Sequence, residues 1–175
     1  METLTKTKWA IDPTHSEVGF KVKHMMISTV KGNFNSFDAT VHAENEDFSD
    51  AQVEVVIDTN SINTNNADRD GHLQSADFFA SEEFPKMTFK STSFDGNKMK
   101  GELSIKDVTK EVELNVDFNG AAVDPYGQHK AGFEISGEIN RKDFGLSWSA
   151  VTEAGNIVVS DKVKLVIDAQ FTKQQ

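Results

Sequence analysis

Apolar residues recur at every second position over long parts of the chain. In residues 18–22, 112–118, 131–139 and 163–171, apolar residues or glycine alternate with residues that are mostly polar. A period of two is typical of strands that bury one face and expose the other to water. These four stretches therefore predict half-buried strands of an antiparallel sheet.

Weaker patterns predict five more strands, at residues 9–11, 32–42, 52–58, 87–94 and 98–105. The segment Asp95-Gly96-Asn97 predicts a tight turn, because glycine and asparagine tolerate positive φ. Residues 107–110 predict a second short connection, between Ile105 and Val112. Roughly eight or nine short strands at this spacing indicate a barrel or a sandwich.

Two stretches break the alternation. Residues 60–84 include a short polar segment that predicts a helical turn near residues 65–75, starting after Asn65-Asn66. Residues 141–150 predict a loop that carries Phe144 and Trp148. Because the chain contains no repeat and no low-complexity linker, we expect a single domain over residues 1–175.

Charge and composition exclude several classes of function. The chain has 18 Lys and Arg against 28 Asp and Glu, a net charge of −10, which disfavours binding to nucleic acid or to an anionic bilayer. It has no cysteine, and so no thiol nucleophile, disulfide or thiolate metal site. No apolar run is long enough to span a membrane, and the first residues lack the apolar region of a secretory signal. We expect a cytoplasmic protein.

Polar residues give little sign of catalysis. The five histidines show no paired spacing typical of metal ligands, and no nucleophile motif is present, so we expect no metal and no cofactor. His24 continues the apolar face of residues 18–22 and is expected to point inward, as a hydrogen-bonded core residue or a catalytic group. Arg69 is the single Lys or Arg between Asp38 and Pro85, a stretch with 12 acids. It forms either a structural ion pair or a contact with the head of a ligand.

Aromatic residues cluster in the two irregular stretches. Phe78 and Phe79 are adjacent, Phe84 follows shortly after, and Phe144 and Trp148 lie in the second stretch. The interior of an eight-stranded barrel is just wide enough to be filled by side chains or to hold one small ligand. Composition does not separate a filled barrel from a hollow one.

Several blocks of residues resemble the YceI-like family, in the order in which the family has them. The blocks are residues 9–24, 28–34, 57–64, 69–79, 84–91, 101–105, 108–110, 141–146 and 160–163, so that the core of the domain covers about residues 9–171. The resemblance implies an extended eight-stranded antiparallel barrel of lipocalin type, with a helical stretch near one end and an apolar tunnel. It also implies that a long isoprenoid or another amphiphile lies with its tail in the tunnel.

We therefore expect an all-β protein that binds, stores or transports one polyisoprenoid, quinone, or fatty acid or amide without catalysis. The alternatives are an enzyme that acts on a lipid with an interior histidine, and an interaction module with a filled barrel. The sequence leaves open whether the chain forms a homodimer. The candidate ligand-binding residues are Phe20, Val22, His24, Val55, Ile57, Arg69, Phe78, Phe79, Met87, Phe89, Leu103, Leu114, Val116, Phe133, Ile135, Arg141, Phe144, Trp148, Leu165 and Ile167.

Overall fold

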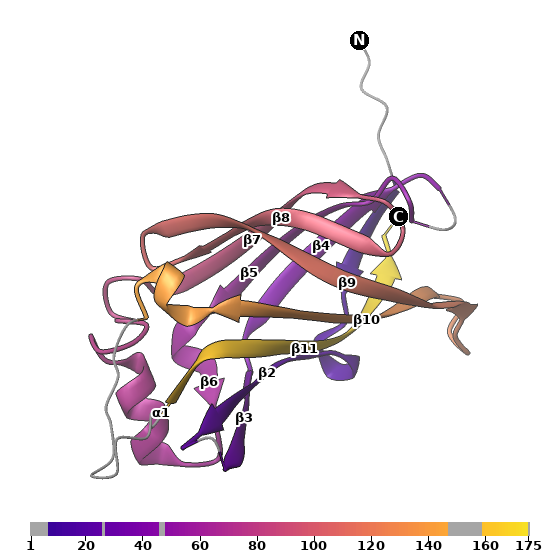
Figure 1. The fold of residues 1–175 in the computed structure, drawn as a ribbon. Helices are drawn as coiled ribbons and strands as arrows, with labels where there is room; N and C mark the ends of the chain where they lie inside the picture. Colours follow the sequence, from indigo (N-terminus) through magenta and orange to yellow (C-terminus); the bar gives the residue numbers. More distant parts are fainter. Residues whose placement is uncertain (1–6, 26, 46–47, 147–158, 175) are drawn as a thin grey trace.

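The chain forms an antiparallel β-barrel with one short α-helix (Figure 1). The computed structural model describes residues 7–25, 27–45, 48–146 and 159–174. The strands are β1 (Thr7–Ile11), β2 (Glu17–His24), β3 (Ser28–Phe34), β4 (Phe37–Ala43), β5 (Gln52–Asp58), β6 (Ile62–Asn63), β7 (Lys86–Phe94), β8 (Lys98–Ile105), β9 (Val108–Val123), β10 (His129–Asn140) and β11 (Val159–Lys173). The helical segments are α1 (Ala67–Gln74) and the 3-10 turns η1 (Pro13–His15), η2 (Thr59–Ser61) and η3 (Arg141–Phe144).

The eleven segments make up eight barrel strands, because three of the strands are interrupted. The first strand consists of β1 and β2, the second of β3 and β4, and the third of β5 and β6. The long strand β11 closes the barrel, since it pairs with β10 along one edge and with β1 and β2 along the other. The eight-stranded antiparallel barrel that the family resemblance implies is confirmed.

Two of the three interruptions, those of the second and third strands, are joined by main-chain hydrogen bonds. The Asn35 amide donates to the Ser61 carbonyl at 3.0 Å, and the Asp58 amide donates to the Ser36 carbonyl at 3.0 Å. These bonds satisfy backbone groups that have left the strand ladders, as main-chain polar groups require. The strand expected over residues 32–42 is thus divided into β3 and β4 at Asn35 and Ser36. The inward positions change phase at this break, from Gly32 and Phe34 to Phe37 and Ala39, which a strand running without interruption over residues 32–42 does not allow.

The helical prediction near residues 65–75 is confirmed by α1. The Asn66 side chain caps α1 by accepting a hydrogen bond from the Arg69 amide at 3.0 Å. In the described parts of the chain, no helix has the length and apolar character needed to cross a membrane. The connection expected at residues 107–110 is shorter than predicted, because β9 already starts at Val108 and the turn is confined to Lys106 and Asp107.

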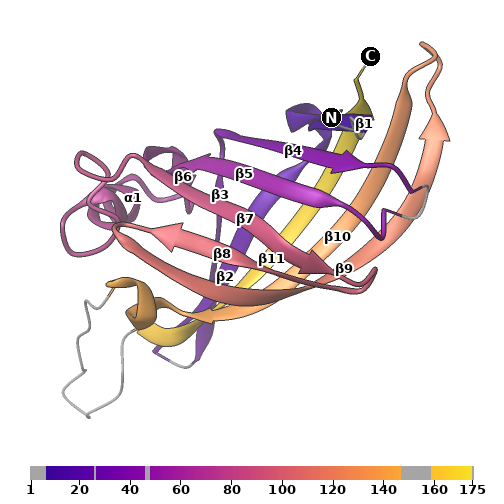
Figure 2. The same cartoon turned by 90° about the horizontal axis from the view of Figure 1, so that it is seen from above.

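The two ends of the barrel are covered differently (Figure 2). One end carries α1 and η3, and at the other the β9–β10 hairpin extends past the barrel. At the hairpin end Phe48, only 3% exposed, packs edge-on against Trp9, Phe118 and Phe133, with ring centroids 5.1–5.3 Å apart. This aromatic plug fills the barrel at that end, and the remaining interior lies toward α1.

Candidate functional site

An apolar cavity lies inside the barrel. Its volume is about 220 Å³, and apart from Arg141 and Gly19 every described residue that lines it has an apolar side chain. A single water needs at least about 10–15 Å³ of such space, so the cavity is far larger than a site for one water. An apolar cavity of this kind favours a hydrocarbon chain over water.

Most of the apolar candidates from the sequence line this cavity. They are Phe20, Val22, Val55, Ile57, Phe78, Phe79, Met87, Phe89, Leu103, Leu114, Ile135, Leu165 and Ile167. They meet there because side chains at every second position of a strand point to the same face of the sheet. Phe78 and Phe79 come from the turn after α1 and are both buried, although they are neighbours in the chain. The Phe79 ring packs edge-on against Phe34 of β3, with centroids 5.9 Å apart.

Three of the apolar candidates lie elsewhere. Phe133 is buried in the aromatic plug, where its ring stacks on Phe118 at 5.1 Å, and it does not line the cavity. Val116 of β9 is also buried without lining the cavity. Phe144 of η3 is 2% exposed and borders a groove on the outside of the barrel. Trp148 lies outside the described residues. For Phe133 and Val116 the alternation predicts burial correctly, but it does not tell which level of the barrel is plugged.

His24 does not point into the interior as the apolar pattern suggested. It is exposed at the end of β2, next to the β2–β3 turn, and does not line the cavity. Strand β2 ends at His24, so the face that carries Phe20 and Val22 is no longer covered by the barrel at this residue. All five histidines are in the described part of the chain, and none of them lines the cavity.

The two candidate arginines are engaged with the protein itself. The Arg141 guanidinium is only 3% exposed and donates to the main-chain oxygens of Leu146 at 2.6 Å and Ser160 at 2.9 Å. Burial lowers the pKa of Arg141, while the nearby Asp161 carboxylate, 3.8 Å away, acts in the opposite direction. Arginine stays charged in proteins. Arg141 therefore connects η3 to the beginning of β11, and it borders the cavity from that position.

Arg69 is held at the edge of α1. Its Nε donates to the Thr64 hydroxyl at 2.8 Å, and its Nη2 donates to the Thr64 carbonyl at 2.7 Å. The Asp70 carboxylate accepts from the Thr64 amide at 2.8 Å. These bonds fasten α1 to the end of β6, and Arg69 does not line the cavity. The position agrees with a structural role for Arg69, through hydrogen bonds rather than through an ion pair.

The sequence reasoning missed several lining residues, among them Val18, Phe34, Ile62, Leu73, Met99, Ile105 and Phe171. For Met99 and Ile105 the signal was present, because both alternate with Leu103 in β8. Phe48 of the plug was also missed. It stands alone in the polar stretch of residues 44–50, and a single phenylalanine in such a loop is a reason to expect that it is buried.

Comparisons with known proteins agree with this architecture. The family model of the YceI-like domain matches residues 9–171. A UPF0312 protein of Staphylococcus aureus is 39% identical over 167 residues, which cover 95% of this chain and 98% of the relative. The crystal structure of a Campylobacter jejuni YCEI protein matches with a TM-score of 0.72 at 35% identity, covering 100% of both chains.

A more distant structure has the same fold. It is a polyisoprenoid binding domain from Saccharophagus degradans, with a TM-score of 0.70 at 14% identity, and the match covers 95% of this chain and 98% of that one. At this identity the likeness concerns the fold alone.

Proposed function

The chain belongs to the YceI-like family, and on this basis we propose that it binds, stores or carries one long-chain apolar or amphipathic molecule in its barrel interior, without catalysing a reaction. The observation that carries the proposal is the apolar cavity of about 220 Å³ within a closed barrel. The lining residues named above are the proposed contacts of the hydrocarbon tail. Candidate ligands are a polyisoprenoid, a quinone, or a fatty acid or amide.

The tail supplies most of the binding free energy in this proposal. Each methylene group removed from water contributes roughly 0.8 kcal/mol before the cost of ordering the chain. A dozen buried carbons therefore outweigh a single charged hydrogen bond, which contributes about 1.5–3 kcal/mol. Because the cavity is finite, affinity should increase with tail length and level off once the tail fills it.

The positions of the histidines favour binding over catalysis. An enzyme that uses an interior histidine needs that ring within reach of both the substrate and a carboxylate. The described His–carboxylate pairs, His15 with Asp12 and His72 with Asp77, are 2.9 Å apart, and both histidines lie outside the cavity. A filled-barrel interaction module does not account for the hollow interior. The solved structure with the same fold that is named as a polyisoprenoid binding domain is consistent with a prenyl tail.

A displacement assay tests this proposal. A fluorescent fatty ligand is bound to the protein and displaced by alcohols of increasing chain length, from 6 to about 20 carbons. Affinity should rise about fourfold per methylene at first and then level off. The same protein with Leu103→Arg, which places a charge on the cavity wall, should lose uptake, whereas Glu102→Gln on the outer face should keep it. Affinity that does not depend on chain length, or uptake that survives Leu103→Arg in a folded protein, contradicts the proposal.

A further inference from the structure

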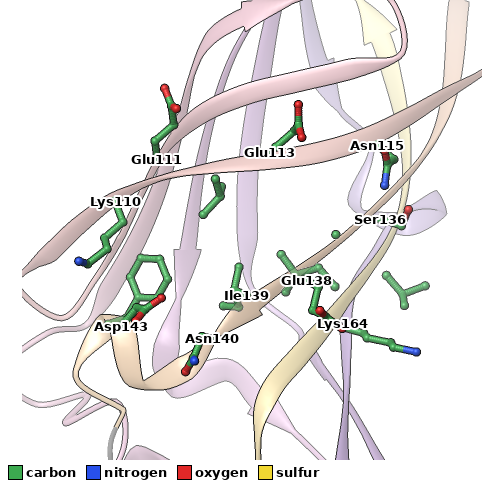
Figure 3. A pocket seen from close by; sticks show the side chains of 15 residues that line it. Lys110, Glu111, Glu113, Asn115, Ser136, Glu138, Ile139, Asn140, Asp143 and Lys164 are labelled. Atoms are coloured by element: carbon green, nitrogen blue, oxygen red, sulfur yellow. The ribbon is translucent and has the colours of Figure 1, made fainter.

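The barrel wall has an opening between β9 and β10. These strands pair from Val123 and His129 as far as Asn115 and Ser136. Both continue toward η3, yet in this part, all of which the structure describes, they no longer pair with each other. There β9 pairs with β8, and β10 pairs with β11. The two strands diverge (Figure 1), and a groove of about 710 Å³ lies between them (Figure 3). We call this region the β9–β10 gap.

The β9–β10 gap borders the interior cavity. Val112 of β9, Ile139 of β10 and Leu165 of β11 line both the groove and the cavity. At Gly137, opposite Leu114, a Cβ atom would lie 2.6 Å from the Leu114 Cδ2 atom, so the Leu114 side chain covers the glycine and closes the wall at that point. Beyond it, the apolar side chains that the cavity and the gap share are surfaces that a hydrocarbon chain leaving the cavity would follow.

The outer rim of the gap carries more hydrogen-bond acceptors than cations. Its acidic residues are Glu111, Glu113, Glu138 and Asp143, and its basic residues are Lys110 and Lys164 (Figure 3). Lys162 lies 3.8 Å from Glu138 and partly neutralises it. The rim contains no arginine among its described residues, and the net charge of the chain is −10. Phosphate groups are typically held by clusters of cationic donors, whereas carboxylates accept hydrogen bonds from hydroxyl, amide and ammonium groups.

We propose that an amphiphile in the cavity places its polar head in the β9–β10 gap, and that the rim selects an uncharged or cationic hydrogen-bond donor over a phosphate. The proposal rests on the proposed function and specifies the class of head group: hydroxyl, amide or ammonium. It is consistent with binding that is dominated by the tail, because the head then adjusts affinity without supplying most of it.

Other polar grooves are less suited to the head. The groove beside α1, lined by residues such as Gln74 and Glu82, shares no described residue with the cavity. A groove over β2 and β3 shares Gly19 and Phe20 with it, but these strands pair continuously from Val18 and Phe34 to His24 and Ser28. The wall is therefore closed by main-chain hydrogen bonds at that point.

The position of the head is tested by affinity labelling. The chain has no cysteine, so single-cysteine variants report one site each. Ser136→Cys places a thiol on the rim of the gap, and Ala76→Cys places one beside α1. The probe is N-dodecyl bromoacetamide, whose reactive carbon lies in the head, and N-ethyl bromoacetamide measures the intrinsic reactivity of each thiol. Intact mass gives the rates.

We expect the dodecyl probe to accelerate labelling of Ser136→Cys at least tenfold over the ethyl probe, with no comparable acceleration at Ala76→Cys. Faster labelling at Ala76→Cys, or equal acceleration at both positions, overturns the assignment of the gap. Displacement of a fluorescent fatty ligand by dodecanol separates this outcome from a failure of the proposed function. Displacement without labelling at Ser136→Cys refutes the gap alone, and absence of displacement refutes the binding function itself.

The selection of the head is tested with ligands that share one tail. Dodecylamine and dodecanol should bind at least about tenfold more tightly than dodecyl phosphate, at concentrations below micelle formation. The double variant Glu113→Gln, Glu138→Gln should reduce this ratio severalfold. The matched control Glu134→Gln changes an exposed residue on the same face of β10, where β9 is still paired, and should leave the ratio unchanged. Equal or tighter binding of the phosphate contradicts the inference.

Discussion

Replacing Gly32 with alanine should displace the Phe20 ring from the barrel wall. The two residues are directly opposite each other on β3 and β2. An alanine Cβ at position 32 would lie 2.4 Å from Cζ and 2.8 Å from Cε2 of Phe20, and 2.9 Å from Cγ2 of Thr64. All three are side-chain atoms, so the backbone can stay in place while the ring moves. Phe20 lines the cavity, and the cavity is the free space next to it.

The expected cost follows from this overlap. Overpacking a core position costs about 1–3 kcal/mol, and replacing glycine with alanine recovers about 0.4–1 kcal/mol by restricting the unfolded chain. The net loss in the free energy of unfolding should be about 1–2 kcal/mol, which lowers the melting temperature of a domain of this size by about 2–8 °C. If the ring takes the place of one or two methylene groups of the tail, affinity falls about four- to fifteenfold.

Thermal unfolding and ligand displacement measure the two effects. The control is Gly71→Ala in α1, where a Cβ meets nothing within 4 Å, and which should stabilise the protein by up to about 1 kcal/mol. In the double variant Gly32→Ala, Phe20→Leu, the smaller side chain relieves the overlap, so the double variant should be more stable than the sum of the single changes indicates. Strict additivity, or an unchanged affinity of Gly32→Ala, would refute the described packing of Phe20 against Gly32.

Three further changes probe the barrel. Phe89→Arg places a charge in the cavity wall and should unfold the protein or abolish lipid uptake, since a lone buried charge costs several kcal/mol. Lys90→Glu on the outer face should do neither. Equal melting temperatures of the two variants would contradict the assignment of Phe89 and Lys90 to opposite faces. Phe48→Ala removes the centre of the aromatic plug and should lower the free energy of unfolding in urea by about 3–5 kcal/mol, whereas Tyr126→Ala, at a residue 88% exposed, should leave it nearly unchanged. Asp12 accepts hydrogen bonds from Thr14, then from His15 and Lys130, which hold the pKa of its carboxyl well below its usual range. The Asp12 carboxylate therefore stabilises the folded protein above its unfolded pKa, and this stabilisation is lost as pH falls through its folded pKa. Asp12→Asn should lower the free energy of unfolding by about 1–2 kcal/mol at pH 7 and by progressively less in acid. A loss of stability that does not depend on pH would contradict this role of Asp12.

The period-two pattern predicted most of the strands and most residues of the inner face. Val163, Leu165 and Ile167 of β11 are inside because each step of two residues returns a side chain to the same face. The break at Asn35 was not predicted, although the apolar alternation changes phase between Phe34 and Phe37. The interruption at residues 59–61 was not predicted because it depends on hydrogen bonds between segments about 25 positions apart, which leave no local pattern.

The site was predicted less completely than the fold. Phe133 has the same pattern as Ile135, yet the first belongs to the plug and the second to the cavity. The difference comes from Phe48, which enters the barrel from the loop between β4 and β5. The β9–β10 gap was not visible either, since Val112 and Leu114, which lie in the unpaired part of β9, alternate as regularly as the residues of its paired part. Only the register of both strands reveals where their pairing ends.

The central claim, one long-chain amphiphile in the barrel, is tested most directly by native mass spectrometry. The protein is purified without detergent, measured intact, extracted with organic solvent, and measured again after addition of a long-chain alcohol. The account predicts a protein that takes up one alcohol molecule per chain, and that loses this capacity with Phe89→Arg in a folded variant. A protein that takes up no ligand, or one that binds several molecules equally well with and without Phe89→Arg, would contradict it.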